Sequence, residues 1–220
     1  MSTKFESLVL EIKNKQFKNK VLYTNSKISL KNGDKIMIVG ESGSGKTTLL
    51  KLMMGIDKCF DGKWLLNDKE VPVSKRWETI KSFSSFIFQD VYLIDYLTAR
   101  ENILLPFNFS KKKVDEQYLK EIIEVLDIDD LLDTKVNVLS GGEKQRIVLA
   151  RALITKPEII FADEPTASLD DKNVFIFMDF INLINRKYHI SIVMVTHRES
   201  LSNRFDTVYR IEDGAIRERS

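Results

Sequence analysis

The chain has 220 residues, of which 43% are hydrophobic and one, Cys59, is a cysteine. This length and apolar content are typical of one globular domain or two lobes around a shared core, and they exclude disordered and fibrous proteins. The formal net charge is +2, so the bulk charge indicates neither nucleic acid nor anionic lipid as a partner. No stretch approaches the roughly 18 to 20 apolar residues of a membrane-spanning helix, and no signal peptide is evident, so we expect a cytosolic location.

Strand and helix patterns alternate along the chain. Residues 8–30 contain short apolar segments that end in a glycine turn, which predicts an antiparallel β layer. Residues 35–39 predict a buried strand that runs into a glycine-rich loop and then a helix. Apolar strands are predicted at 158–162 and 191–195, on either side of a helix over 171–188. Strands that alternate with helices predict a parallel sheet of the α/β class.

The stretch from residue 90 to 155 has a mostly helical pattern. Thr98 and Glu101 have the spacing of a capping box at a helix start. Helical spacing of apolar side chains follows at Val114, Tyr118, Ile122, Val125 and Leu126. We therefore expect residues 90–155 to form a helical insert in a core made of residues 1–89 and 156–220.

A phosphate-binding motif lies between the first buried strand and its helix. Residues 40–47 read GESGSGKT and match the pattern G-x-x-x-x-G-K-S/T. Glycines let consecutive backbone N–H groups point at phosphate oxygens, and the helix start adds partial positive charge. Lys46 suits the β and γ phosphates, and the hydroxyl of Thr47 suits Mg²⁺. The residues predicted to bind the nucleotide here are Gly40, Glu41, Ser42, Gly43, Ser44, Gly45, Lys46, Thr47 and Thr48.

Two adjacent carboxylates follow the predicted strand 158–162. Asp163 and Glu164 stand at the carboxyl end of that strand, where an α/β sheet holds its ligands. Asp163 suits Mg²⁺, and a carboxylate bound to Mg²⁺ is a poor base, so Glu164 is the residue expected to orient or deprotonate a water. The alternative is a pair of solvated carboxylates before Pro165. The phosphate-binding loop upstream favours a catalytic pair.

A second phosphate receptor is predicted at residues 139–146, which read LSGGEKQR and open a helix. Ser140 and Glu143 also form an ordinary capping box. Both interpretations can hold together, because a helix N-terminus with a serine and the two glycines Gly141 and Gly142 can also bind phosphate. Two receptors and one phosphate-binding lysine suggest that one receptor serves a nucleotide held by another subunit.

These motifs together resemble those of ATP-binding cassette (ABC) ATPases. The residues that carry the resemblance are the loop at 40–47, Gln89, LSGGE with KQR, the ADEPT segment, Ser168-Leu169-Asp170 and His197. It covers nearly the whole chain and implies one ABC nucleotide-binding domain over residues 1–220. The implied fold is a P-loop NTPase (RecA-like) core with an antiparallel β subdomain and an inserted helical subdomain. The implied activity is ATP hydrolysis, with ATP and Mg²⁺ as cofactors.

The resemblance also implies a dimer in which two domains face each other head to tail. Each ATP would lie between the P-loop of one domain and the signature residues Ser140, Gly141, Gly142 and Glu143 of the other, which therefore act in trans. Glu143 stands where many members carry Gln, a variant frequent among export-type relatives. Asp170 occupies the position of the D-loop aspartate.

Three further residues match functional positions of the family. Gln89 resembles the glutamine that contacts Mg²⁺ or the attacking water and links the site to the helical insert. His197 resembles the switch histidine that contacts the γ-phosphate and helps to hold Glu164. The family stacks an aromatic ring on adenine, and Phe17 is our choice for that role, with Tyr23 as the competing candidate and core packing as the alternative for each.

The segment from Tyr92 to Ile103 resembles that of lipoprotein-releasing, macrolide-export and cell-division ATPases. These are separate subunits whose partners are integral membrane permeases, so the expected partners are a permease and a second copy of this chain or a related subunit, without nucleic acid. The implied place is peripheral, on the inner face of the cell membrane, and export is favoured over import. The apolar side chains of the segment suit either a permease-docking groove or the core of the insert.

Two other functions remain as alternatives. A soluble cassette ATPase in an assembly or scaffold role would share the same motifs without transport. A P-loop metabolite kinase would leave LSGGE and His197 unexplained, and the sequence offers no motif for its acceptor.

Overall fold

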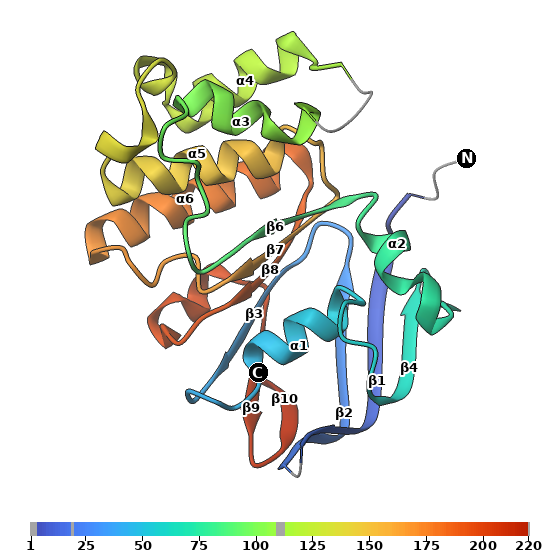
Figure 1. Ribbon diagram of the computed structural model, residues 1–220. Coiled ribbons are helices and arrows are strands. Elements are labelled where there is room, and N and C mark those ends of the chain that lie inside the picture. Colours follow the sequence, from blue (N-terminus) through green and yellow to red (C-terminus); the bar gives the residue numbers. More distant parts are fainter. Residues whose placement is uncertain (1–3, 19, 109–112, 220) are drawn as a thin grey trace.

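Two sheets and a layer of helices make up the part of the chain that the computed structural model describes, which is residues 4–18, 20–108 and 113–219 (Figure 1). The strands are β1 (Ser7–Phe17), β2 (Lys20–Lys31), β3 (Lys35–Gly40), β4 (Asp61–Leu66), β5 (Lys69–Glu70), β6 (Ser84–Ile87), β7 (Ile159–Asp163), β8 (Ser191–Val195), β9 (Thr207–Glu212) and β10 (Ala215–Arg219). The helices are α1 (Lys46–Met53), α2 (Arg76–Ile80), α3 (Ala99–Asn108), α4 (Glu116–Leu126), α5 (Gly141–Leu153) and α6 (Asp171–Tyr188). Short 3₁₀ segments lie at Val73–Lys75, Asp129–Leu131, Val136–Val138 and Glu199–Arg204.

The larger sheet has the strand order β10-β9-β3-β8-β7-β6. Strands β3, β8, β7 and β6 run parallel, β9 is parallel to β3, and β10 pairs with β9 in an antiparallel hairpin. All five residues of β8 are buried, as expected of a central parallel strand that is covered on both faces. The predicted parallel sheet and α/β class are confirmed.

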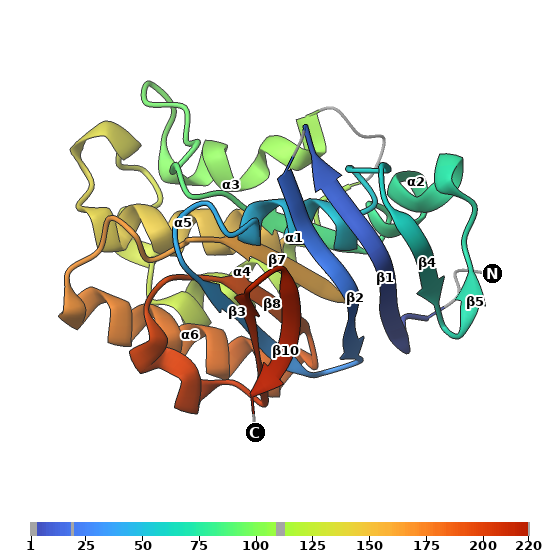
Figure 2. The ribbon, with the colours of Figure 1, turned by 90° about the horizontal axis from the view of Figure 1, so that it is seen from below.

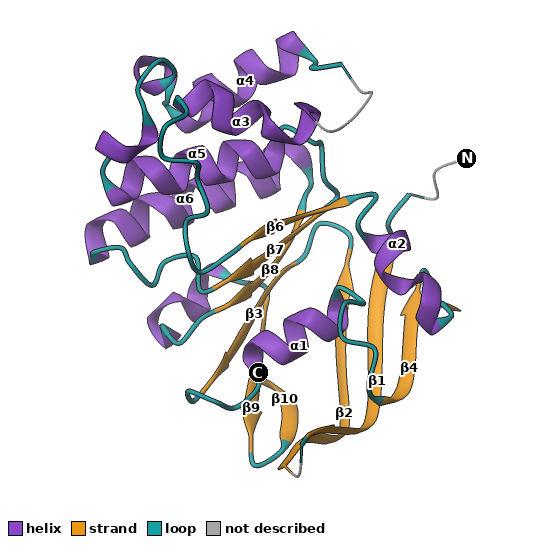
Figure 3. Ribbon diagram, in the orientation of Figure 1, coloured by secondary structure: helices purple, strands orange, loops and turns teal. Residues whose placement is uncertain are grey.

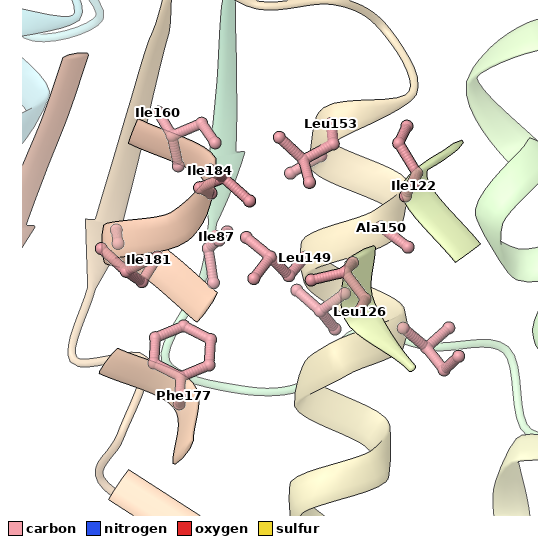
Figure 4. Packing of buried hydrophobic residues seen from close by; sticks show 14 of the residues in the cluster. Ile87, Ile122, Leu126, Leu149, Ala150, Leu153, Ile160, Phe177, Ile181 and Ile184 are labelled. Carbon is pink, nitrogen blue, oxygen red and sulfur yellow. The ribbon is translucent and has the colours of Figure 1, made fainter. Parts of the chain in front are cut away.

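Alternate side chains of the central strands pack into two separate hydrophobic cores. Met37 and Val39 of β3 lie in the core that contains buried residues of helices α3 to α6. Their neighbours Ile36 and Ile38 lie in the other core, with α1 and the β layer, because successive side chains of a strand point to opposite faces. Figure 4 shows part of the first core, where leucines of α5 and isoleucines of α6 gather near Ile160 of β7.

The smaller sheet is antiparallel, with the strand order β2-β1-β4-β5. Figure 2 shows β2, β1 and β4 side by side, next to α1. The indole of Trp64 on β4 is buried and donates to the carbonyls of Leu52 and Met53, both at 3.1 Å, so it ties this layer to the end of α1. The predicted antiparallel layer is present, and β4, β5 and α2 were not predicted from the sequence.

The helical layer contains α3, α4 and α5, which lie within residues 90–155 as expected (Figure 3). The capping box before α3 is present, since the Thr98 N–H donates to Glu101 at 2.8 Å and the Glu101 N–H donates to Thr98 Oγ1 at 3.2 Å. Helix α4 begins at Glu116, so Val114 lies before the helix while its side chain still packs against the core. The subdomain boundaries at residues 90 and 155 remain a prediction. Within the described ranges, every helix is too short or too polar to span a bilayer.

Candidate nucleotide-binding and catalytic site

A cavity of about 550 Å³ opens at the carboxyl ends of the central parallel strands. The loops that follow β3, β7 and β8 meet there, together with the ends of β1 and β6, which is where open α/β sheets bind their ligands. The lining residues are Phe17, Lys20, Leu22, Ser42, Gly43, Gly45, Lys46, Thr47, Thr48, Gln89, Glu164, Ala167 and His197. The structure therefore brings most of the predicted site residues into one place.

The loop between β3 and α1 is held in shape from inside. The ammonium of Lys46 donates to the carbonyls of Gly40 at 2.9 Å and Glu41 at 3.0 Å. From the β layer, the hydroxyl of Tyr23 donates to the Gly45 carbonyl at 2.5 Å. Gly45 has φ 105°, and a Cβ there would lie 2.4 Å from that hydroxyl, so the close approach requires glycine. Burial raises the pKa of Tyr23, which keeps its hydroxyl a donor.

This loop fits phosphate groups. Lys46 is mostly buried, and in the described part of the chain no carboxylate forms an ion pair with it, so its direct partners are the two loop carbonyls. Gly43 has φ 75° and open space beside its Cα. The helix start at Lys46 adds the partial positive charge of its free N–H groups. Each of these features favours an anion in the cavity.

Asp163 and Thr47 fit a magnesium ion. Thr47 Oγ1 donates to Asp163 Oδ1 at 3.1 Å, so a hydroxyl and a carboxylate oxygen, both hard ligands, lie together beside the loop. Burial raises the pKa of Asp163, and the Thr47 hydrogen bond partly offsets this. Among the described residues, there is no group of three or more His, Cys, Asp or Glu side chains suited to a metal. Mg²⁺ usually takes one or two protein ligands besides water and phosphate oxygens.

Glu164 and His197 form a close pair at the mouth of the cavity. Glu164 Oε2 accepts from the His197 N–H at 3.3 Å and lies 2.9 Å from His197 Nδ1. The Glu164 side chain is 13% exposed and that of His197 is 60% exposed. The backbone of Glu164 has φ 48°, in the left-handed region, and its N–H donates to the Val195 carbonyl at 2.9 Å. His197 thus holds the carboxylate through one oxygen, Val195 holds the backbone, and the side chain still reaches solvent.

The two candidates for an adenine contact lie in different surroundings. Phe17, at the end of β1, is 59% exposed and lines the cavity. Tyr23 is fully buried beneath the phosphate-binding loop. The geometry favours Phe17 and gives Tyr23 a supporting position that sequence reasoning missed. Lys20 and Leu22 of β2 also line the cavity, and no motif marked them.

The signature residues lie away from this cavity, at the start of α5. Ser140, Gly142 and Glu143 line a separate depression of about 310 Å³. The capping box is present: the Ser140 N–H donates to Glu143 Oε2 at 2.7 Å, and the Glu143 N–H donates to Ser140 Oγ at 3.4 Å. Hydrogen bonds from the Ser140 side chain and backbone lower the pKa of Glu143. Asp170 accepts from the Asn173 N–H at 2.8 Å and caps α6.

Gln89 lies just after β6, is exposed and lines the cavity. The segment that follows Gln89 has an exposed part and a buried part. Tyr92 and Tyr96 are 59% and 74% exposed, whereas Ile103 is buried in the helical core. The core interpretation therefore holds for Ile103, and the docking-groove interpretation stays a prediction for the exposed Tyr92 and Tyr96.

The model of the ABC transporter family matches residues 23–167. The chain belongs to the ABC transporter family. The lipoprotein-releasing system ATP-binding protein LolD of Francisella tularensis subsp. holarctica is 38% identical over 195 residues, which are 86% of this chain and 84% of that protein. The macrolide export ATP-binding/permease protein MacB of Campylobacter jejuni subsp. jejuni is 36% identical over 197 residues, which are 87% of this chain and 31% of that protein.

Solved structures of the cassette MJ0796 share the fold. Its dimeric form has a TM-score of 0.78 at 29% identity and covers 97% of this chain and 98% of that one. A dimeric post-hydrolysis form, bound to ADP and Pi, has a TM-score of 0.77 at 29% identity. The P-loop NTPase fold is thus confirmed, and the chain is an ATP-binding, ATP-hydrolysing subunit of the ABC transporter type.

We expect Asp163→Asn to stabilise the nucleotide-free protein at pH 7. Burial raises the pKa of Asp163 in the folded state, so its contribution to stability is largest below the unfolded pKa and is lost as the pH rises through the folded one. The Asn carbonyl oxygen can still accept from Thr47. Urea denaturation at a series of pH values should show a higher free energy of unfolding at pH 7, and the difference should shrink toward about pH 4.

The exposed Asp95 provides the matched control, since Asp95→Asn removes a charge without relieving burial. A lower free energy of unfolding for Asp163→Asn at pH 7 would contradict this interpretation of the site.

Proposed function

We propose that this chain is the ATPase subunit of an export-type ABC transporter, in which Mg-ATP closes two copies into a dimer that drives a separate membrane permease. The observation that carries the proposal is the division of the site. The phosphate loop, Glu164 and His197 share one cavity, whereas Ser140 and Gly142 line another depression. A second copy, turned head to tail, supplies the missing helix N-terminus to each ATP.

The proposed chemistry is transfer of the γ-phosphoryl group to water. The water oxygen forms a bond to phosphorus, the bond to the β-phosphate oxygen breaks, and Glu164 orients the water and takes its proton. Lys46 binds the β and γ phosphates, and His197 holds Glu164 and contacts the γ-phosphate. Thr47, Asp163 and Gln89 would hold Mg²⁺, which supplies charge neutralisation at the phosphate oxygens when bound.

The remaining predicted residues surround the ATP molecule. Phe17 stacks on adenine, and the backbone N–H groups from Gly40 to Thr48 bind the phosphates. From the partner, Ser140, Gly141, Gly142 and Glu143 complete the phosphate site, and Asp170 lies at the dimer contact. The dimeric MJ0796 cassettes support this arrangement, as cassettes of this fold form dimers.

The surface of exposed aromatic residues on either side of Gln89 is the proposed permease-docking site. It consists of Phe88, Tyr92 and Tyr96, and the rings of Phe88 and Tyr92 meet edge to face at 5.3 Å. Arg151 of α5 donates to the Tyr92 carbonyl at 2.5 Å, which ties this surface to the signature helix. MacB, named an ATP-binding/permease protein, supports a permease as the occupant. The chain would then lie peripherally on the inner face of the membrane, without a nucleic-acid partner.

The relatives also bear on the alternatives. LolD and MacB are named for lipoprotein release and macrolide export, which favours transport over a scaffold role. The lipoprotein-releasing and macrolide-export groups favour export over import.

Glu164→Gln should keep ATP binding and lose turnover by about 100-fold or more, because the amide cannot accept the proton of water. The variant should then accumulate as a dimer in Mg-ATP, seen by size-exclusion chromatography, while wild type turns over ATP in a steady-state assay. Lys46→Ala is the contrasting variant and should weaken nucleotide binding itself. Near-normal turnover in Glu164→Gln would remove Glu164 from its role, and unchanged affinity in Lys46→Ala would remove Lys46.

Phe17→Ala should weaken ATP binding by about tenfold, since stacking of an aromatic ring on a base contributes roughly 1–3 kcal/mol. Its melting temperature without nucleotide should stay unchanged because the ring is exposed. Val21→Ala, also exposed but outside the cavity lining, is the control and should bind ATP normally. Equal affinity of Phe17→Ala and wild type for ATP would exclude Phe17 as the adenine contact.

Replacing both Tyr92 and Tyr96 with Ser should abolish co-purification of a membrane permease from detergent-solubilised membranes while ATP-dependent dimerisation persists. The reason is loss of the exposed apolar area that the permease would cover. Phe175→Ser removes an aromatic ring of similar exposure on α6 and should leave recovery unchanged. Full recovery of the permease with the double variant would place the docking surface elsewhere.

A further inference from the structure

A buried glutamine on the signature helix contacts the catalytic loop. Gln145 lies within the first two turns of α5 and is 1% exposed. Its Nε2 donates to the Pro165 carbonyl at 2.7 Å. Its Oε1 is buried and has no hydrogen-bond partner among the described residues. The reverse orientation of the amide would place two oxygens against each other, so the contact itself assigns Nε2 as the donor.

The accepting carbonyl belongs to the residue next to Glu164. The chain turns there, and the Ala167 N–H donates to the Glu164 carbonyl at 3.1 Å. Within this turn Glu164 holds φ 48°, a backbone conformation that side chains other than glycine adopt only where their surroundings impose it. The Val195 carbonyl holds the Glu164 N–H from the sheet side at 2.9 Å. Gln145 holds the following peptide from the helical side.

We propose that Gln145 is a positioning residue for Glu164. Its amide fixes the turn from Glu164 to Ala167, so that the carboxylate points at the place of the attacking water. Gln145 does not line the nucleotide cavity and acts only through that turn. The inference rests on the proposed role of Glu164 and assigns a further residue to the same reaction.

The hydrogen bond also connects two active sites. Helix α5 begins at the signature residues, which serve the ATP of the partner, while the turn it holds serves the ATP of its own chain. A shift of α5 on contact with the partner's nucleotide would therefore reach Glu164 through Gln145. This contact would give closure of the dimer a route to water activation.

The test is Gln145→Met, which keeps similar length and volume and removes the donor. We expect kcat to fall about tenfold or more, with KM and the ATP dissociation constant within about twofold of wild type. In a Glu164→Gln background, Gln145→Met should reduce the residual turnover no further and leave ATP-dependent dimerisation intact, because residues that act through one another are not additive. A role in packing alone would not lower kcat while leaving KM and the ATP dissociation constant unchanged.

Two further variants keep the test decisive. Leu153→Ala, at the far end of α5, should lower the melting temperature and leave kcat unchanged, which separates stability from positioning. Gln145→Asn keeps an amide donor with shorter reach, so its kcat should lie between those of wild type and the Met variant. If Gln145→Met fails to fold, a wild-type kcat in Gln145→Asn overturns the proposal.

The outcomes also separate this inference from the proposed function. A folded Gln145→Met with a kcat within about twofold of wild type overturns the role of Gln145. A further loss in the Glu164→Gln background also overturns it, since Gln145 would then act elsewhere. Normal turnover in Glu164→Gln itself would instead remove the role of Glu164 on which the inference rests.

Discussion

Parallel pairing of three central strands places the chemistry of this chain at one edge. Strand β8 pairs with β3 on one side and β7 on the other, in a register that sets Val195 opposite both Ile38 and Asp163. The segments that leave the three strands therefore start at the same level. Their first residues include the phosphate-binding loop, Glu164 and His197. A shift of one residue in either pairing would turn buried side chains toward the wrong core and separate these groups.

Helix α5 carries or contacts three of the functional parts of the chain. Its N-terminus carries the signature residues, Gln145 reaches the catalytic turn, and Arg151 reaches the backbone of Tyr92. The helix is also the centre of the larger hydrophobic core, which makes it rigid relative to these contacts. A rigid rod with polar contacts near both ends can pass a displacement from the segment after Gln89 to the signature and to Glu164. These contacts are the physical route for the coupling proposed above.

The secondary structure could be predicted from the sequence where the local pattern and the tertiary contacts favour the same element. The central strands are apolar on both faces, and the P-loop lies between a strand and a helix. The type of each of these elements and their order along the chain could therefore be predicted. Strands β4 and β5 could not, because short segments of mixed polarity acquire their structure from pairing, here with β1 and with each other. Burial distinguishes Phe17 from Tyr23 as the candidate adenine contact. It depends on how the β layer packs over the loop, which the sequence does not show. Gln145 belongs to the LSGGEKQR motif, but the carbonyl that it contacts, that of Pro165, is 20 residues away. The sequence alone therefore does not reveal this contact.

The phosphate-binding loop holds Lys46 in a position that suits an anion even without bound nucleotide. An ammonium group has three N–H donors, and the carbonyls of Gly40 and Glu41 accept two of those of Lys46. One donor therefore remains for a phosphate oxygen without rearrangement of the loop. The cost lies elsewhere, in the half-buried carboxylate of Asp163 and in the left-handed backbone of Glu164, a conformation that is unfavourable for a non-glycine residue by roughly 1–2 kcal/mol. Both costs fall on the two groups to which the proposed reaction assigns the magnesium ion and the attacking water.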